Sequence, residues 1–457
     1  MRLRRAGTGL AAVALAAALT GAGIAPAATA AVATGAPASV AAAPEASAPA
    51  PAASATPTPE SQADVARDAE YWLDEYGVRD AWQTTKGRGT TIAIIDTGIG
   101  RTPVEFSGVV GGADFSGVGA ADGRKPVGAV DGNHGSWVAS LAASRGTGDD
   151  TGMIGVAPEA NLLAISIGFG AASSVPFVQQ VADAMRWAVD HGADVINLSF
   201  TTNTLTWDTS WDSAFQYAFD HDVVVVVAAG NKGSGTEEVG APATIPGVLT
   251  VAGVNRDEIA SEEASTQGIT IGVSAPSEQL LGVSADGQLV RWEGTSGAAP
   301  IVAGVVALVR SAHPELNADN VINRIIKTAR PAAGAKKVPD ATYGYGLINA
   351  AGAVSASVAT VDKSPLGMTL AEWVRLYRRA EVAPLPQPST SATPVVVPEL
   401  PAADHVVERS PLLPSADTLR YGTVPLVGGT LAAILVALGV TAAARRIRSE
   451  RARASSR

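Results

Sequence analysis

The chain has 457 residues, of which 47% are hydrophobic, so it is long enough for one large domain with additional segments. Its formal net charge is −10 and no basic patch is apparent, which disfavours a phosphate-binding or nucleic-acid function. The absence of cysteine excludes a disulfide framework and a cysteine-ligated metal site, although a domain of this size can be exported and stable without disulfides.

The first thirty residues have the layout of a secretory signal peptide. Arginines within the first five residues precede an apolar run over 10–19, and the small residues that follow place a cleavage site near Ala30. The alternative is a signal anchor that is never cleaved, but the short apolar run favours cleavage. Residues 31–63 are rich in Ala and Pro and have almost no bulky apolar side chain, so we expect an extended linker there.

Residues 64–358 have the character of a folded domain in which strands alternate with helices. We expect strands at 91–95, 162–167, 194–198, 223–229 and 248–254, and helices at 134–143, 176–189, 210–219, 297–312 and 318–329. Continuous Val and Ile runs are typical of strands in a sheet that is buried on both faces. The alternation predicts an α/β domain with a mainly parallel central sheet.

Residues 359–423 are Pro-rich, and we expect them to form a juxtamembrane tether. Within this segment, residues 370–379 could form a short amphipathic helix that docks on a partner or on the membrane surface. The alternative is a local helix inside the tether, because so short a helix is marginal without packing.

Residues 424–444 contain no charged residue and are long enough to cross a bilayer as a helix. An arginine-rich tail, 445–457, follows at once. The positive-inside rule therefore predicts a single-pass protein with a cytoplasmic C-terminus and an extracytoplasmic domain. A buried core helix is the alternative, disfavoured because we expect no further domain after it.

The segment 291–300 is the most informative part of the chain. Ser296 follows Gly294 and Thr295 at the expected start of an apolar helix, and the residues after it are tiny. A hydroxyl there would be exposed at the positive end of the helix while the helix behind it packs into a core. Ser296 is therefore a candidate nucleophile.

A candidate acid and a candidate base come earlier in the chain. Asp96 ends the strand at 91–95, and acids at the carboxyl ends of parallel strands lie in the crevice where ligands bind. Taken alone, Asp96 is more simply a strand-end cap. His134 opens a predicted helix, whose positive end keeps the imidazole neutral and able to accept a proton.

Asn231 follows a buried strand that ends in Ala229 and Gly230, so its amide would reach the same crevice with little bulk around it. An NH₂ donor there can hold a developing oxyanion, although a turn asparagine is the alternative. The chain order of Asp96, His134 and Ser296 is one that an Asp-His-Ser triad fold uses.

Five motifs in this order resemble the subtilases, over about residues 72–353. They lie at 94–98, 134–136, 155–158, 228–231 and 294–296. The resemblance implies a subtilisin-like three-layer fold and a serine endopeptidase that forms an acyl-enzyme and uses no cofactor or metal. The signal peptide, Pro-rich extension and C-terminal helix together resemble the mycosins, the membrane-anchored subtilases of actinobacterial type VII secretion systems, and imply that machinery as a partner.

The resemblance also implies a role for each site residue. Ser296 would attack the peptide carbonyl, His134 would carry the proton, and Asp96 would orient the imidazole. The side chain of Asn231 and the backbone N–H of Ser296 would form the oxyanion hole. The substrate polypeptide would lie extended against Ser166, Ile167, Gly168, Ser199, Phe200, Thr201, Ala229 and Gly230.

The chain departs from the family pattern at several positions. Asn133 stands where the family usually has Gly, and Ser136 where it usually has Thr. Gly297 replaces a bulky residue after the nucleophile, and a glycine there loosens the first helical turn. Thr201 replaces a frequent Gly and could narrow the specificity pocket. Mycosins usually carry disulfides, which this chain cannot form.

Two alternatives accompany the expected membrane-anchored protease. One is a catalytically weak structural subunit that stabilises a secretion complex, but all four active-site groups persist, which such a subunit does not need. The other is a processing subtilase without a secretion partner. Asp149 and Asp150 could contribute to a calcium site, but two loop acids are more simply solvated, and we expect no metal.

Overall fold

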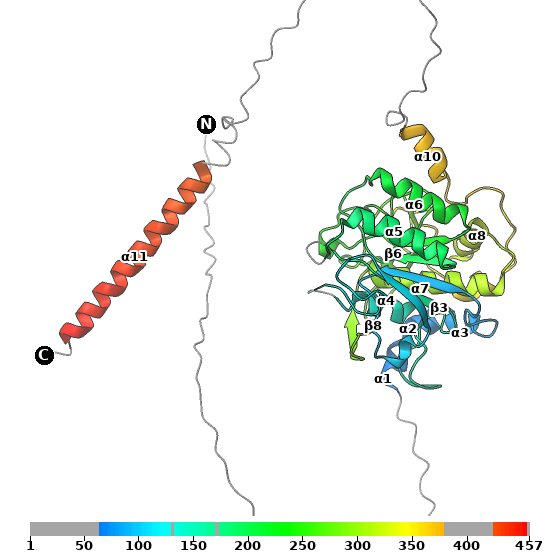
Figure 1. Ribbon diagram of the computed structural model, residues 1–457, viewed down its shortest axis with the longest axis horizontal. Coiled ribbons are helices and arrows are strands. Elements are labelled where there is room, and N and C mark those ends of the chain that lie inside the picture. The colour runs from blue at the N-terminus through cyan, green and yellow to red at the C-terminus, as the bar shows by residue number, and fades with distance from the viewer. Residues whose placement is uncertain (1–63, 129–131, 170–172, 379–423, 455–457) are drawn as a thin grey trace, which may run out of the picture. The chain divides into compact units, whose positions relative to one another are not determined.

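The computed structural model describes residues 64–128, 132–169, 173–378 and 424–454. The predicted signal peptide, the linker and most of the tether therefore lie outside the described residues. The chain divides into two units, a folded body that ends at Arg379 and a second unit whose described part is one helix, α11 (Val424–Ala454) (Figure 1).

A seven-stranded parallel sheet forms the centre of the folded body, in the order β2-β3-β1-β4-β5-β6-β7. Its strands are β1 (Thr91–Asp96), β2 (Val109–Asp114), β3 (Asn161–Ser166), β4 (Val195–Leu198), β5 (Val224–Ala228), β6 (Leu249–Val254) and β7 (Ile271–Pro276). A separate antiparallel hairpin joins β8 (Leu280–Val283) and β9 (Leu289–Trp292). The predicted mainly parallel sheet is confirmed.

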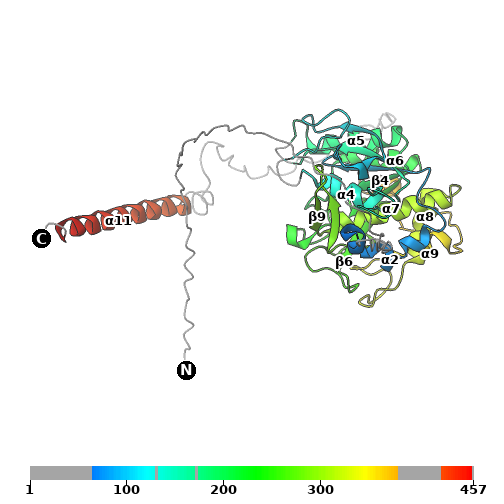
Figure 2. The ribbon, with the colours of Figure 1, turned by 90° about the horizontal axis from the view of Figure 1, so that it is seen from below.

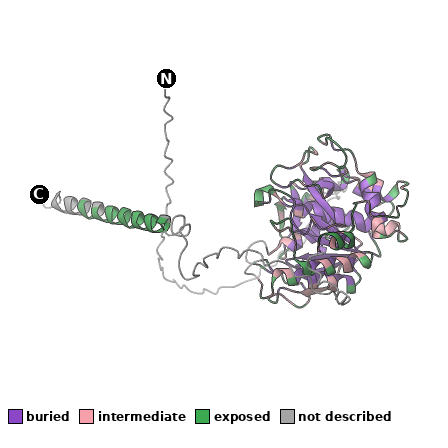
Figure 3. Ribbon diagram, turned by 90° about the horizontal axis from the view of Figure 1, so that it is seen from above, coloured by how far each residue is buried: buried purple, intermediate pink, exposed green. Residues whose placement is uncertain are grey.

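Helices cover both faces of the sheet and make a three-layer body (Figures 1 and 2). One face carries α4 (His134–Ala143) and α7 (Thr295–Ala312), and the other carries α5 (Phe177–Asp190) and α6 (Thr209–Asp220). The remaining helices of the body are α1 (Val65–Ala69), α2 (Tyr71–Glu75), α3 (Val78–Ala81), η1 (Val104–Phe106), η3 (Lys232–Ser234), α8 (Ala318–Thr328), α9 (Ala350–Ser355) and α10 (Leu370–Tyr377). Because both faces are covered, six strands of the sheet are buried almost throughout, and only the edge strand β2 is partly exposed (Figure 3).

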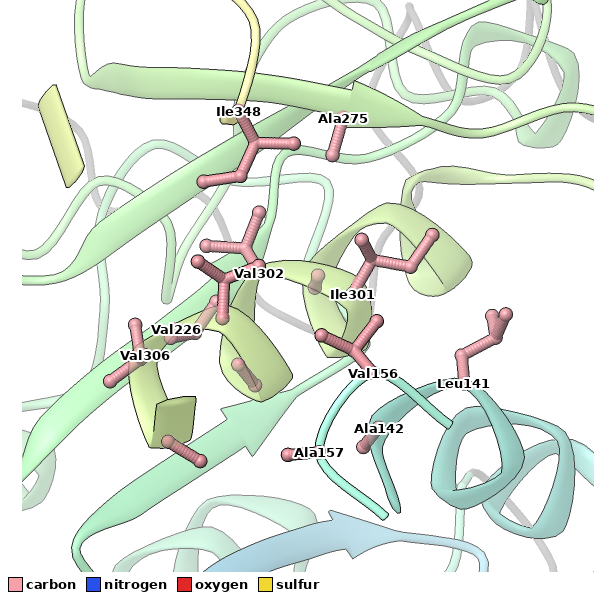
Figure 4. Close-up of a cluster of buried hydrophobic side chains, with 14 of the residues drawn as sticks. Leu141, Ala142, Val156, Ala157, Val226, Ala275, Ile301, Val302, Val306 and Ile348 are labelled. Carbon is pink, nitrogen blue, oxygen red and sulfur yellow. The ribbon is translucent and has the colours of Figure 1, made fainter. Parts of the chain in front are cut away.

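Helix α7 is the central helix of the core. It is long and apolar enough to cross a membrane, but 78% of it is buried inside the folded body. Ile301 and Val302 lie among the apolar side chains of the cluster in Figure 4. A side chain at Gly304 would lie 2.6 Å from Cβ of Val156, so glycine allows the close packing here. The apolar character of α7 therefore serves the core and supplies no membrane span.

The C-terminal helix contains the predicted membrane segment. Its apolar stretch runs over Leu426–Ala442, and side chains such as Leu431 and Leu435 are exposed rather than buried against protein. Such a stretch is shorter than the 21 residues predicted at 424–444, and the membrane span itself stays a prediction.

Within the folded body, the predicted strands and helices agree with the structure to within two residues at every boundary. Helix α11 instead continues ten residues beyond the predicted membrane segment, to Ala454. The sequence patterns missed β2, β7 and the β8–β9 hairpin. Two glycines interrupt the apolar run of β2, and glycine is depleted in strands. The folded body also extends beyond the expected boundary at residue 358, because Leu370 of α10 is only 1% exposed and packs on the body.

The N-terminal helices carry a buried acid. Glu70 lies between α1 and α2 and is 1% exposed, and its Oε1 accepts a hydrogen bond from the backbone N–H of Ile154 at 2.6 Å. The nearest cation, the guanidinium of Arg67, is 3.9 Å from Oε2. Burial raises the pKa of Glu70 from 4.5 to about 8, against the lowering effect of that hydrogen bond and of Arg67.

Replacing Glu70 by Gln is expected to stabilise the protein at alkaline pH. The unfolded carboxyl ionises near pH 4.5 whereas the folded one stays protonated to about pH 8, so the free energy of unfolding falls as pH rises through this window. The side-chain oxygen of a glutamine still accepts the hydrogen bond from Ile154, but a glutamine does not ionise. The variant should therefore avoid the fall in the free energy of unfolding, which we expect to be roughly 2–4 kcal/mol at pH 9. Urea unfolding of both proteins in a Ser296→Ala background at pH 5 and 9 measures it, with the exposed Asp68→Asn as control. Equal slopes against pH for Glu70→Gln and the parent would contradict it.

Candidate active site

Asp96 and His134 meet where β1 ends and α4 begins. Asp96 is fully buried, and its two carboxylate oxygens lie 2.8 and 3.0 Å from Nδ1 of His134. The backbone N–H of Thr97 donates to Oδ1 of the same carboxylate at 2.7 Å. A side chain at Gly135 would lie 2.5 Å from the carbonyl oxygen of Gly98, so glycine lets α4 start directly against the strand end. The acid is therefore held in place from two sides.

Ser296 is the second residue of α7 and is partly exposed. Its hydroxyl donates to the carbonyl oxygen of Ser199 at 3.0 Å, and the hydroxyl of Ser199 donates back to the carbonyl oxygen of Ser296 at 2.9 Å. These reciprocal bonds tie the start of α7 to the chain that follows β4. Rotation about χ1 of Ser296 redirects its hydroxyl within the cleft, and catalytic hydrogen bonds often tighten only when a substrate is bound.

The structure explains the unusual glycine after the candidate nucleophile. A Cβ at Gly297 would lie 2.3 Å from Cδ1 of Leu280, which belongs to β8, and 3.2 Å from Cδ1 of Leu141. The space that a bulky side chain would occupy is thus already filled by the β8–β9 hairpin. Gly297 is required by packing, whatever it costs in helix propensity.

Asn231 is oriented by the residue before the serine. The backbone N–H and the hydroxyl of Thr295 both donate to Oδ1 of Asn231, at 2.8 and 2.9 Å. The Thr295 hydroxyl in turn accepts from the N–H of Gly230 at 3.0 Å. With its oxygen held in this way, the carboxamide has its NH₂ group as the remaining donor. Gly294 adopts a φ of 138°, and a Cβ at this position would lie 2.9 Å from Nδ2 of Asn231. A glycine there therefore leaves room for the carboxamide.

His134, Asn231 and Ser296 line one cleft of about 660 Å³, and Asp96 lies behind the imidazole. The other lining residues are Thr97, Val127, Gly128, Phe169, Ser199, Phe200, Thr201, Asn203, Ala228, Gly230, Ser234, Thr236 and Thr295. In the described parts of the chain, no group of three or more His, Cys, Asp or Glu side chains is arranged to hold a metal ion. The cleft therefore joins a hydroxyl, an imidazole and a carboxamide.

Half of the predicted substrate-binding residues line this cleft. Ser199, Phe200, Thr201 and Gly230 do so. A Cβ at Gly230 would lie 3.0 Å from the γ-methyl of Thr201 and 2.6 Å from that of Thr236. The methyl groups of Thr201 and Thr236 therefore both lie close to Gly230 in the cleft.

The other predicted residues, Ser166, Ile167, Gly168 and Ala229, are buried and are not among the lining residues. The hydroxyl of Ser166 donates to Asp114 at 2.6 Å. The main chain of Gly168 is occupied by the side chain of Gln180, which accepts from its N–H at 2.7 Å and donates to its carbonyl oxygen at 3.3 Å. An extended substrate could pair with the main chain of Gly168 only if the side chain of Gln180 moved away. The substrate-binding role of Gly168 therefore stays a prediction.

Nine of the sixteen lining residues were not predicted as site residues, among them Phe169, Asn203 and Thr236. Phe169 directly follows the predicted edge segment and is an exposed aromatic, which is a signal that could have been used. Asn203 and Thr236 lie in irregular segments and meet through a hydrogen bond of 3.0 Å from the Thr236 hydroxyl to the Asn203 side chain. No local sequence pattern predicts the contact between Asn203 and Thr236.

Two indole rings flank the imidazole. The rings of Trp292 and Trp137 lie 5.7 and 6.4 Å from that of His134, in edge-to-face arrangements. The indole N–H of Trp137 donates to the hydroxyl of Ser284 in the β8–β9 turn at 2.9 Å. Asn133, another departure from the family pattern, accepts from the N–H of Ala285 in the same turn at 3.0 Å. The hairpin therefore holds the start of α4.

If Asn231 has the predicted oxyanion role, replacing it by Ala lowers kcat for peptide hydrolysis by about 10²–10³ with KM nearly unchanged, because such a donor acts on charge that develops in the transition state. Thr295→Val, which removes one of the two bonds that orient the carboxamide, should lower kcat by only about tenfold. Steady-state kinetics with a chromogenic peptide measure both. A loss in KM alone for Asn231→Ala would contradict an oxyanion role.

Comparisons with known proteins show the family that this chain resembles. The family described as the subtilase family (Peptidase_S8) matches residues 87–346. The chain is 33% identical to subtilisin DY of Bacillus licheniformis, over 58% of this chain and 91% of that protein. It is 32% identical to mycosin-4 of Mycobacterium tuberculosis, over 63% of this chain and 70% of that protein. The solved structure of the MycP3 protease from the type VII (ESX-3) secretion system is 30% identical, with a TM-score of 0.53, and the match covers 65% of this chain and 90% of that one.

Proposed function

The chain belongs to the subtilase family of serine proteases, and on that basis we propose that it is a membrane-anchored endopeptidase that cuts polypeptides outside the cytoplasm. The observation that carries the proposal is that His134, Ser296 and Asn231 line one cleft while the buried Asp96 is hydrogen-bonded to His134 from behind. A hydroxyl, an imidazole and a carboxylate paired with that imidazole are the three groups that acyl transfer by a serine needs.

Peptide hydrolysis would proceed in two halves. The Ser296 oxygen bonds to the carbonyl carbon while His134 takes the hydroxyl proton, and the carbonyl electrons move onto oxygen. The carbon–nitrogen bond then breaks, the amine leaves with the proton from His134, and an acyl-enzyme remains. A water molecule repeats these steps and releases the acid. Asp96 fixes the Nδ1–H tautomer and stabilises the imidazolium throughout.

Stabilisation of the oxyanion is the second requirement. The Asn231 NH₂ group and the backbone N–H of Ser296 at the start of α7 would donate to it. The Thr295 bonds pre-orient the carboxamide, so that little reorganisation is needed when charge develops.

A serine-directed fluorophosphonate probe tests the activity. We expect the full-length protein in detergent to be labelled and Ser296→Ala to remain unlabelled. Labelling that survives Ser296→Ala, or folded wild-type protein that is never labelled, would instead favour the catalytically weak structural subunit. Ser199→Ala serves as the matched control, because it removes a neighbouring cleft hydroxyl and should still be labelled.

The proposed layout has a cleaved signal peptide at 1–30, a linker at 31–63, the protease body, a tether that ends at 423, a membrane helix at 424–444 and a cytoplasmic tail at 445–457. The exposed apolar stretch Leu426–Ala442 supports the membrane helix. The absence of cysteine makes a direct test possible. A membrane-impermeant thiol reagent on whole cells should label Ser210→Cys and not Ser456→Cys, and the reverse pattern would overturn the topology.

Association with a type VII secretion system is supported by the mycosin relative and by the MycP3 structure. We expect membrane components of such a system to co-purify with the protein in mild detergent. Their absence from preparations of both the wild type and Ser296→Ala would favour a processing subtilase without that partner.

A further inference from the structure

The first described part of the tether is docked on the protease body. Residues 369–378, here called the strap, contain α10, which begins at a capping box between Thr369 and Glu372. Leu370 is 1% exposed and belongs to the same buried cluster as Phe200, a residue of the cleft. The predicted amphipathic helix therefore exists, and its apolar side packs on its own protein next to α6. It is therefore not an isolated helix inside the tether.

Two residues of the strap enclose one indole of the body. The rings of Trp373 and Trp207 lie 4.5 Å apart, and the guanidinium of Arg378 lies 5.6 Å from Trp207 and 5.3 Å from Trp373. Arg378 also lies 2.5 Å from the carboxylate of Asp212 in α6 and donates to the carbonyl oxygen of Trp207 at 3.2 Å. Side chains of this ion pair are only 14% and 13% exposed, so water screens it little.

The carboxylate of Asp212 also holds Trp207 directly, because the indole N–H of Trp207 donates to it at 2.6 Å. Trp207 is thus fixed by its ring, its N–H and its carbonyl oxygen. Two of these three restraints, the ring contacts and the bond to the carbonyl oxygen, come from the strap.

Trp207 ends the segment that forms one wall of the cleft. Ser199, Phe200, Thr201 and Asn203 of this segment line the cleft, and residues 199–207 contain no helix or strand. The segment is tied to the body near its middle, where the N–H of Thr202 donates to Ala241 at 2.6 Å. Beyond that point two further bonds reach the wall, from the N–H of Ala241 to Thr204 and from the hydroxyl of Thr244 to Leu205, each at 2.8 Å. The side chain of Leu205 is nevertheless 53% exposed, and the strap adds the restraint at Trp207, where the wall ends.

We propose that Trp373 and Arg378 are positioning residues for substrate binding, which hold the 199–207 wall through Trp207. The inference rests on the proposed protease function and adds a specificity determinant from outside the residues 87–346 that match the subtilase family. The strap touches the wall and none of the triad groups, so its loss should weaken the binding of an extended peptide and leave the chemical step intact.

The test compares Trp373→Ala and Arg378→Ala with the wild type in the full-length, detergent-solubilised protein. We expect KM for a peptide with four residues before the cut to rise about three- to tenfold and kcat to change less than about twofold. The rate of fluorophosphonate labelling should not change, because that small probe reacts at Ser296 and does not extend to the end of the wall that the strap holds. Trp373→Phe should restore KM, and Leu376→Ala, on the 43%-exposed side of the same helix, should leave it unchanged.

A second measurement reports the wall directly. In a Ser296→Ala background, thermolysin should cut before Leu205 faster in both alanine variants than in the parent. Unchanged KM in both variants, or an equal loss in Leu376→Ala, would overturn the proposal. If an alanine variant fails to fold, Trp373→Leu and Arg378→Gln replace it, under the same criteria. Wild-type protein that neither hydrolyses peptides nor reacts with the probe would instead refute the protease function.

Discussion

Replacing Ser296 by alanine is expected to lower kcat for peptide hydrolysis by on the order of 10⁶, the loss that removal of the nucleophile causes in subtilisin. The hydroxyl lies at the start of α7 in a cleft that also holds His134 and Asn231, and no other group there forms the acyl-enzyme in the proposed mechanism. Folding should be unaffected, because the side chain is partly exposed and loses one hydrogen bond.

Single-turnover hydrolysis at saturating enzyme, with intact-mass analysis of the purified protein, measures this loss. Ser199→Ala is the matched control, since it removes the hydroxyl that bonds to the backbone of residue 296 and should cost far less. The mass analysis also reports whether the protein cuts its own N-terminal segment. A variant Ser296→Ala that retains more than about one hundredth of wild-type kcat would show that another residue is the nucleophile.

Replacing Asp96 by asparagine is expected to lower kcat by about 10⁴. Both oxygens of this fully buried carboxylate face Nδ1 of His134, at 2.8 and 3.0 Å. An asparagine can present its NH₂ group to Nδ1, which then holds the tautomer with the proton on Nε2. That tautomer cannot accept the proton of Ser296, so the geometry survives while the base is lost.

A second aspartate, half-buried, separates this effect from a general loss of stability. Asp194 lies at the opposite, amino end of β4 and accepts from the N–H of Thr91 at 2.8 Å. Asp194→Asn should lower the melting temperature and leave kcat within about threefold. The measurement compares kcat of the two variants at a temperature where both are folded, and it separates loss of the base from loss of stability. A kcat of Asp96→Asn within tenfold of the wild-type value would exclude the proposed role of Asp96.

The β8–β9 hairpin links two departures from the family pattern, Gly297 and Asn133, that have no common cause in the sequence. Leu280 fills the space next to Gly297, Ser284 and Ala285 bond to the start of α4, and Trp292 packs against His134. These positions lie more than a hundred residues from α4 along the chain. Local patterning could not predict the hairpin, because its strands have four residues each and pair only with one another.

The sequence alone determined the fold class, the boundaries of most elements and the identity of the four candidate active-site groups. Continuous Val and Ile runs predict buried parallel strands wherever they occur. Asp96, His134, Asn231 and Ser296 could be singled out because each lies at the end of an element whose local pattern is strong. Local residue spacing is sufficient for such features, since strand and helix periodicities are properties of neighbouring residues.

Only the tertiary structure decided which segments meet. The strand order places β1 between β3 and β4, which brings the end of Asp96's strand beside α4 and near the 199–207 wall. The occupation of Gly168 by Gln180, the pairing of Thr236 with Asn203, and the docking of Trp373 on Trp207 all join residues that belong to different elements. Such contacts depend on the shapes of several packed layers at once, and no spacing along one segment encodes them.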